Sequence, residues 1–209
     1  SDEPEVKPKS LLGKRLRSPS VSEDELTVIR IDDLKKASDI YELRDGLRFV
    51  KPYEHEFVAF TKRRWIGMSI VDVFKNEFKA FSSDYYDKAI LNGKITVNKK
   101  MIGLEYKLRD GDRIVHNVIR QETPVLSDKP AVLFDDDRFV AVDKPSSMPV
   151  HACGNFRYNT LVEICERELG FKDLKTVHRL DRQTSGIVFF ARKAESSNEF
   201  REGMLNNLV

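Results

Sequence analysis

The chain has 209 residues, of which 36 are Lys or Arg and 34 are Asp or Glu, and its net charge of +2 excludes an argument for nucleic-acid binding from charge alone. Hydrophobic residues make up 40% of the chain, which leaves room for one ordinary domain or two small ones. Its two cysteines argue against a disulfide framework and against a zinc site, so we expect reduced intracellular thiols and no metal. The sequence has no run of about 18 apolar residues and no signal-peptide core, which predicts an intracellular protein with no membrane partner.

Residues 1–40 are predicted to form a disordered tail, most clearly over the first 27. Proline, serine and mixed charge dominate there, and few large apolar side chains are available to offset the entropy of ordering. The basic run 14–17 precedes Ser18-Pro19, a pattern found in nuclear addresses beside phosphorylation sites. Short basic runs are also common in solvated tails, and we interpret this one in that way.

Residues 41–65 are predicted to form a leading hairpin region. Apolar and polar residues alternate around Asp45-Gly46, a dipeptide typical of two-residue hairpin turns. The region ends in Lys62-Arg63-Arg64-Trp65, where three cations adjoin one indole. This cluster can hold an RNA backbone and stack a base, or it can be a solvated strand end with Trp65 in the core, and the sequence leaves both hypotheses open.

Residues 66–122 are predicted to form a compact unit of two helices followed by strands. Apolar residues recur every four positions from Ile70 to Phe78 and define one broad helical face. Ser82-Ser83 offers N-caps for a second helix, which Asn92-Gly93 closes. Strands are predicted at 95–98 and 108–114.

Two helices, a strand carrying Val-Asn-Lys and a strand entered through Asp-Gly-Asp resemble the alpha-L RNA-binding module. In that family the two helices and the adjoining basic residues hold RNA. The resemblance implies that a set of lysines contacts RNA collectively, although any one of them taken alone is better interpreted as a solvated surface residue. These are Lys75, Lys79, Lys88, Lys94, Lys99 and Lys100.

Residues 123–130 are predicted to be a linker, because Pro124 and Pro130 flank a short polar stretch. A second domain is predicted over 131–209. It opens with a strand, and a turn through Asp-Asp-Asp-Arg leads to a returning strand. These strands are expected at 131–134 and 139–145.

Two helices are predicted in this second domain. The first is capped by Asn159 or Thr160 and ends at Gly170, and the second has capping-box spacing from Ser196 to Glu199. Their apolar faces are expected to lie in the core. These faces comprise Leu161, Ile164, Cys165 and Leu169 in the first helix and Phe200, Met204, Leu205 and Leu208 in the second.

The most distinctive stretch of the chain runs from His178 to Gly186 and reads His-Arg-Leu-Asp-Arg-Gln-Thr-Ser-Gly. It places Asp181 between two arginines in a loop that ends on small residues. The apolar run 187–191 that follows is typical of a buried strand. A fixed scaffold thus presents a carboxylate that can act as a nucleophile or a base on an anionic substrate.

Four elements follow one another in the chain, namely 143–151 with Asp-Lys-Pro-Ser-Ser-Met-Pro-Val-His, 159–162 with Asn-Thr-Leu-Val, 176–181 with Thr-Val-His-Arg-Leu-Asp, and 184–186 with Thr-Ser-Gly. Their order and spacing resemble the RluA-like family of pseudouridine synthases. The resemblance spans residues 46–209 and is strongest to the eukaryotic branch, which carries an alpha-L-type module ahead of the catalytic domain. It implies an α+β fold, with a small alpha-L RNA-binding module followed by part of a mixed-sheet catalytic domain.

The resemblance also implies isomerisation of uridine to pseudouridine in RNA, with tRNA as the expected substrate, by a monomer that needs no cofactor and no metal. Asp181 falls on the family's catalytic aspartate, and Arg179 falls on the arginine that fills the space vacated by the displaced base. Asp181 can attack the anomeric carbon of the sugar or remove a ribose proton, and the sequence does not choose between these routes. Lys144 and His151 are candidates either for RNA phosphate contacts or for turn packing.

Three functional hypotheses follow from these residues. The first is the RNA pseudouridine synthase with Asp181 as catalyst. The second is a truncated, catalytically inactive product that only binds RNA through residues 66–122, because family members continue past Val209 with further strands. The third, a serine hydrolase using Ser185, His178 and Asp181, lacks the Gly-x-Ser-x-Gly elbow, and we interpret His178 instead as a structural hydrogen-bond partner.

Overall fold

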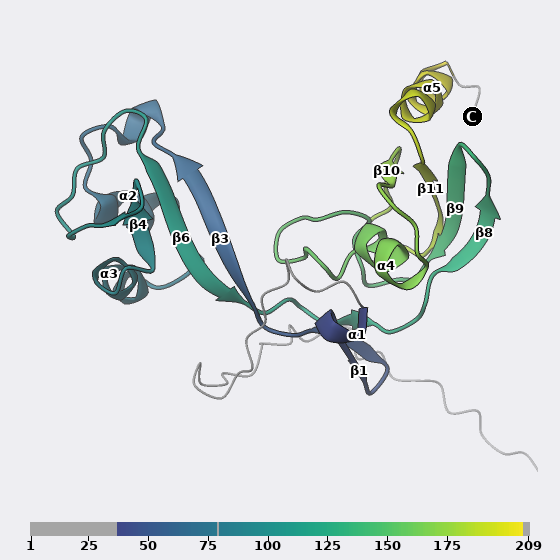
Figure 1. Ribbon diagram of the computed structural model, residues 1–209, viewed down its shortest axis with the longest axis horizontal. Coiled ribbons are helices and arrows are strands. Elements are labelled where there is room, and N and C mark those ends of the chain that lie inside the picture. Colours follow the sequence, from purple (N-terminus) through teal and green to yellow (C-terminus); the bar gives the residue numbers. More distant parts are fainter. Residues whose placement is uncertain (1–36, 79, 207–209) are drawn as a thin grey trace, which may run out of the picture.

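The computed structural model describes residues 37–78 and 80–206, and these form two units with separate hydrophobic cores (Figure 1). The elements of the small unit are β3 (Tyr53–Phe60), a 3-10 helix (Arg63–Trp65), α2 (Ile70–Glu77), α3 (Ser83–Leu91), β4 (Ile95–Val97), β5 (Lys100–Met101) and β6 (Arg113–Arg120). The elements of the large unit are α1 (Ala37–Ile40), β1 (Tyr41–Arg44), β2 (Leu47–Val50), β7 (Val125–Leu126), β8 (Ala131–Asp135), β9 (Phe139–Lys144), α4 (Leu161–Glu168), β10 (Lys175–Thr176), β11 (Gly186–Ala191) and α5 (Ala194–Leu205). Within the described ranges every strand pairing is antiparallel, where a mixed sheet was expected.

The leading hairpin forms as predicted but belongs to the large unit. Asp45 and Gly46 form its two-residue turn with φ of 52° and 72°, the left-handed conformations that a tight hairpin turn requires. Tyr41 and Val50 pack into the core of the large unit. The buried Arg48 guanidinium reaches across and forms an ion pair with Glu168 at the end of α4. The hairpin is therefore fixed to α4 by both apolar burial and charge.

Two predicted segment boundaries need correction. Residues 37–40, assigned to the tail, form α1, and Ile40 is fully buried in the large-unit core. The predicted linker 123–130 contains β7, which pairs with β2. The rest of the tail, together with Lys79 and Leu208, lies outside the described residues.

β3 and β6 form a long antiparallel ribbon that runs the length of the small unit (Figure 1). β3 lies within the predicted leading hairpin region, yet it pairs with β6 over its whole length, from Tyr53 opposite Arg120 to Phe60 opposite Arg113. Its hydrogen-bonding partner is thus distant in sequence, which a local turn signal does not reveal. Trp65 at the end of this region is buried in the small-unit core, so its indole is not available for stacking on a base.

The small-unit helices form as predicted. Ser69 caps α2 and Ser82 caps α3, each by accepting a hydrogen bond from a backbone N–H of the first turn. The strand expected at 108–114 begins only at Arg113, because Asp112 accepts bonds from the Arg109 backbone N–H and from two side chains and so holds the preceding residues in a turn. The hydrogen bonds outweigh the opposing effect of burial and lower the pKa of the Asp112 carboxyl.

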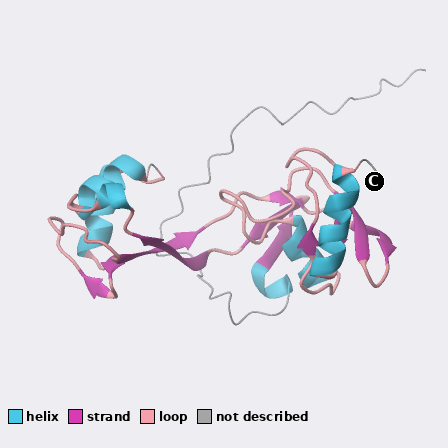
Figure 2. Ribbon diagram, turned by 90° about the horizontal axis from the view of Figure 1, so that it is seen from above, coloured by secondary structure: helices cyan, strands magenta, loops and turns pink. Residues whose placement is uncertain are grey.

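The large unit contains the four-stranded sheet β10-β11-β9-β8, with α4 and α5 beside it (Figure 2). Thr160 caps α4, as one of the two predicted candidates. The capping box predicted at Ser196 is wrong: α5 begins at Ala194, and Ser196 lies buried in its first turn. Two residues expected in the core of this helix, Met204 and Leu205, are exposed in the described structure.

The two units meet at Glu122, a buried carboxylate just beyond the end of β6. Its oxygens accept hydrogen bonds from the Tyr53 hydroxyl at 2.9 Å and from the backbone N–H groups of Tyr158 and Asn159 at 3.0 Å each. The Asn159 amide in turn donates to the carbonyl oxygens of Arg48 and Thr123. Buried polar groups that satisfy one another in this way fix the joint between the units.

Candidate active site

Asp181 lies in the loop between β10 and β11, in the large unit. Its side chain is exposed, and its backbone carbonyl accepts a hydrogen bond from the Thr184 N–H at 3.0 Å, which closes a tight turn. In the described part of the chain no ion pair joins Asp181 to Arg179 or Arg182. The carboxylate is therefore accessible and is not neutralised by its sequence neighbours.

Lys144 holds this loop to the end of β9. Its side chain is fully buried at the end of β9, and the ammonium donates to the carbonyl oxygens of Thr184 at 2.6 Å, Pro145 at 3.0 Å and Arg182 at 3.3 Å. Burial lowers the pKa of the Lys144 ammonium. Of the two hypotheses for this lysine, the structure supports turn packing, since a fully buried ammonium is not available to an RNA phosphate.

Gly186 joins the loop to β11 directly opposite Lys144. Its φ of +136° is unfavourable for other residues, and a Cβ there would lie 3.6 Å from Leu180 Cδ1. The strand that follows is buried on one side only: Val188 and Phe190 lie in the core, whereas Ile187 is exposed. The loop thus has a fixed backbone at its C-terminal end.

His178 has a structural role in this arrangement. Its Nε2 accepts a hydrogen bond from the Phe189 backbone N–H at 2.9 Å, and its ring stacks on Phe200 with centroids 6.1 Å apart. Burial lowers the pKa of the imidazole, which keeps this nitrogen unprotonated as an acceptor. Because Nε2 is engaged by the backbone, it does not serve as a base for Ser185, and the hydrolase hypothesis loses its support.

The two arginines that flank Asp181 are exposed. Arg182 lies over the ring of Phe156, with 5.5 Å between the guanidinium carbon and the ring centroid. Arg179 is exposed two residues before Asp181. Sequence reasoning missed Phe156, because no local pattern indicates that it lies against the loop.

The five described lysines expected to hold RNA, Lys79 being outside the described residues, belong to the small unit and do not converge on Asp181. Lys75 forms an ion pair with Asp87 at 3.0 Å, which reduces its availability to a phosphate. Lys88 on α3 is exposed, as are Lys99 and Lys100 at the β4–β5 turn, and Lys94 is half-buried. These lysines and the Asp181 loop are therefore separate features of the surface.

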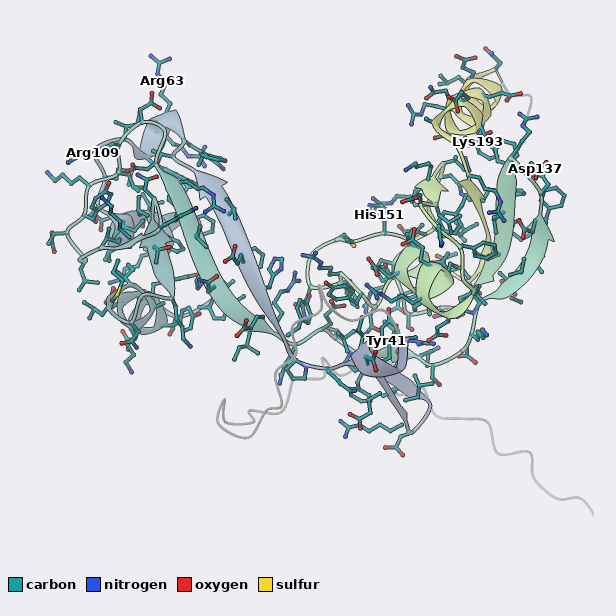
Figure 3. The ribbon with its side chains drawn as sticks, in the orientation of Figure 1. Tyr41, Arg63, Arg109, Asp137, His151 and Lys193 are labelled. Carbon is teal, nitrogen blue, oxygen red and sulfur yellow. The ribbon has the colours of Figure 1, made fainter. Side chains whose placement is uncertain are left out.

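His151, the other residue considered for an RNA phosphate contact, lies in the large unit (Figure 3).

The described residues hold no cluster of His, Cys, Asp and Glu side chains that could bind a metal ion. No helix in these described ranges has the length and apolar character needed to cross a membrane.

Several known proteins are similar to this chain in sequence. Residues 138–207 match the RNA pseudouridylate synthase family. RNA pseudouridine synthase 7 of Oryza sativa subsp. japonica is 41% identical over 169 residues, which are 81% of this chain and 43% of that protein. Pseudouridylate synthase RPUSD2 of Homo sapiens is 40% identical over 177 residues, or 84% of this chain and 32% of its own length. The mitochondrial tRNA pseudouridine(32) synthase of Saccharomyces cerevisiae is 41% identical over 155 residues, or 74% of this chain and 33% of its own length.

These matches place residues 138–207, with the Asp181 loop among them, in the region that the chain shares with RNA pseudouridylate synthases. They support the resemblance to the RluA-like family that the sequence elements indicate. The chain spans less than half the length of the three relatives described above.

Proposed function

We propose that the chain contributes the catalytic aspartate loop of an RNA pseudouridine synthase and that Asp181 is the reacting carboxylate. The observation that carries this proposal is an exposed, unpaired carboxylate on a loop whose backbone is held by the buried Lys144 ammonium. A fixed loop keeps the carboxylate at a constant position relative to a bound sugar, and such positioning accounts for much of an enzyme's rate enhancement. Either proposed route, attack on the anomeric carbon or removal of a ribose proton, uses this one carboxylate.

A uridine inside folded RNA must leave its stack to reach Asp181, which costs about a few kcal/mol. Arg179 is exposed two residues before the carboxylate, and its flat guanidinium can stack on the bases beside the gap. We propose that Arg179 occupies the space that the displaced base leaves.

We further propose that the small unit is an alpha-L-type RNA-binding module. Its two capped helices, the β4–β5 hairpin and the exposed Lys88, Lys99 and Lys100 support this assignment. The yeast relatives named as tRNA pseudouridine(32) and tRNA pseudouridine(31) synthases favour tRNA as the substrate class.

The test is Asp181→Asn in the full protein, with Asp137→Asn as control. Asp137 is also an exposed aspartate in a turn of the large unit, but it is distant in sequence from the loop. Pseudouridine formation is followed on a tRNA transcript, and RNA affinity is measured separately. We expect Asp181→Asn to lose activity and retain RNA binding, while Asp137→Asn keeps both. Normal pseudouridine formation by Asp181→Asn would show that Asp181 is not the catalyst.

A binding-only product is the second candidate function. It is favoured by the separate core of the small unit, which does not depend on the Asp181 loop. The same experiment separates the two candidates: RNA binding without pseudouridine formation by the wild-type chain supports the binding-only function.

A further inference from the structure

One face of the β3–β6 ribbon carries a continuous series of aromatic rings. Tyr53, His55 and Phe57 share this face because side chains alternate along a strand, and their partners on β6 are Arg120, Val118 and His116. Ring centroids lie 4.5 Å apart between His55 and Phe57, 6.5 Å between Phe57 and His116, and 5.9 Å between His116 and Phe81. Phe57 in the middle of the series is 46% exposed and Phe81 at one end is 41% exposed, so these two rings are open to solvent, whereas Tyr53 at the other end is buried.

Arginines border the same series of rings. The guanidinium of Arg120 lies over Phe57 at 5.5 Å, and its nitrogen donates to the Gly154 carbonyl oxygen at 3.1 Å. Arg157 Nη1 lies 3.2 Å from His55 Nδ1. Among the described side chains, none of the recorded ion pairs involves Arg120, Arg157 or Arg182, so these charges remain available to an anion.

One short segment of the large unit links this series to the Asp181 loop. Arg157 belongs to the same short segment, 154–158, as Phe156, and Phe156 lies under Arg182 at 5.5 Å. Arg182 directly follows Asp181. Glu122 bonds both the Tyr53 hydroxyl at the start of β3 and the backbone of Tyr158 and Asn159, which ties the base of the ribbon to the segment that carries Phe156 and Arg157.

We propose that this surface, the aromatic–arginine strip, holds single-stranded RNA next to the target uridine and leads it from the small unit to Asp181. The strip consists of Phe57, Phe81, Arg120, Phe156, Arg157 and Arg182. This proposal rests on the proposed function, since the strip would guide the RNA substrate of that reaction to Asp181.

The chemistry of the strip fits RNA better than an apolar partner. Unpaired bases stack on exposed aromatic rings, and guanidinium groups beside those rings bind phosphates. The carboxylates of β3 do not oppose such binding, because Glu54 and Glu56 lie opposite Ile119 and Asn117 on the other face of the ribbon. The pKa of His55 is lowered by burial and by the neighbouring Arg120 and Arg157, which agrees with a positive potential at this position.

The test uses Phe57→Leu in the full chain, with Phe60→Leu as the matched control. Both phenylalanines are exposed on β3, at 46% and 62%, but Phe60 lies on the opposite face of the ribbon. Binding of a labelled single-stranded oligouridylate is followed by fluorescence anisotropy, and thermal midpoints check that both variants are folded. We expect Phe57→Leu to weaken binding about fivefold or more, because one base loses its stacking partner, and Phe60→Leu to leave it unchanged.

A second pair of variants tests the charges. Arg120→Gln is expected to reduce the slope of affinity against salt concentration by about 1, because one phosphate contact is lost. Arg44→Gln is the control, since Arg44 also lies over a phenylalanine ring, Phe49, but on the hairpin of the large unit.

The proposal that the strip binds RNA would be wrong if each variant changed RNA affinity or its salt dependence as much as its control does. It would also be wrong if the wild-type chain did not bind the oligouridylate. Failure of the catalytic proposal has a different signature, namely unchanged pseudouridine formation by Asp181→Asn. If both pairs of variants show equal effects while Asp181→Asn abolishes pseudouridine formation, the proposed function holds and the proposed role of the strip is wrong.

Discussion

Lys144→Met removes the ammonium that holds the Asp181 loop to β9. The wild-type side chain is fully buried and its three hydrogen bonds all go to backbone carbonyl oxygens around the loop. Methionine has a similar length and fills the same space, but it donates no hydrogen bond. The loop therefore loses its anchor, whereas the Asp181 carboxylate itself is unchanged.

Both the stability and the rate are expected to fall. Hydrogen bonds to a charged group contribute about 1.5–3 kcal/mol each, net of desolvation, so the three bonds of Lys144 contribute about 4.5–9 kcal/mol. In Lys144→Met the three carbonyl oxygens lose their donor, so the free energy of unfolding should fall by several kcal/mol. A displacement of about 1 Å in a catalytic group lowers the rate by about 100-fold, equivalent to about 2.7 kcal/mol of activation free energy.

The assay is single-turnover pseudouridine formation at saturating RNA, with the RNA dissociation constant and the free energy of unfolding measured in parallel. Lys172→Met is the control, because Lys172 is an exposed lysine of the same unit. We expect Lys144→Met to react about 100-fold more slowly with RNA affinity nearly unchanged. A wild-type rate in Lys144→Met, or a loss confined to RNA affinity, would refute the role of Lys144 as the anchor of the loop.

Three further predictions concern stability. Glu168→Ala should destabilise the protein by about 3–5 kcal/mol in chemical denaturation, because it leaves the buried Arg48 charge unpaired, and a cost below about 1 kcal/mol would contradict this. Burial and the nearby Lys94 ammonium lower the pKa of His116 to about 4, so between pH 6.5 and 4 the unfolded chain binds a proton that the folded chain does not. The free energy of unfolding should fall by about 1–3 kcal/mol more in the wild type than in His116→Gln as pH decreases through this window, because the lowered pKa values of His55 and His178 act alike in both. Gly186→Ala should lower stability by about 1–3 kcal/mol in thermal unfolding because its φ of +136° is strained for alanine, whereas Gly103→Ala, with open space around it, should be neutral.

Local signals in the sequence predicted the local structure well. The Asp45-Gly46 turn, the serine caps of α2 and α3 and the threonine cap of α4 all form, because each depends on residues within a few positions of one another. The capping box at Ser196 failed for a related reason. The same spacing fits a helix that has already begun, and the burial of Ser196 in the first turn places the true start at Ala194.

Contacts between distant segments could not be predicted from the sequence. The pairing of β3 with β6, the burial of the hairpin against α4 and the ion pair of Arg48 with Glu168 all join residues more than fifty positions apart. Each depends on tertiary packing, for which one sequence carries no periodic signal. The same reason explains why Phe156 was missed beside Arg182.

The arrangement around Lys144 explains why two separate sequence elements form one candidate site. Lys144 at the end of β9 lies opposite Gly186 at the start of β11, so the Lys-Pro element and the Thr-Ser-Gly element are neighbours in the sheet. The buried ammonium needs carbonyl oxygens, and the loop supplies them by turning the carbonyls of Arg182 and Thr184 inward. A loop whose backbone polar groups face inward in this way leaves its side chains to solvent, and Asp181 is exposed for that reason. The accessibility of the carboxylate is thus a direct consequence of how the buried lysine is satisfied.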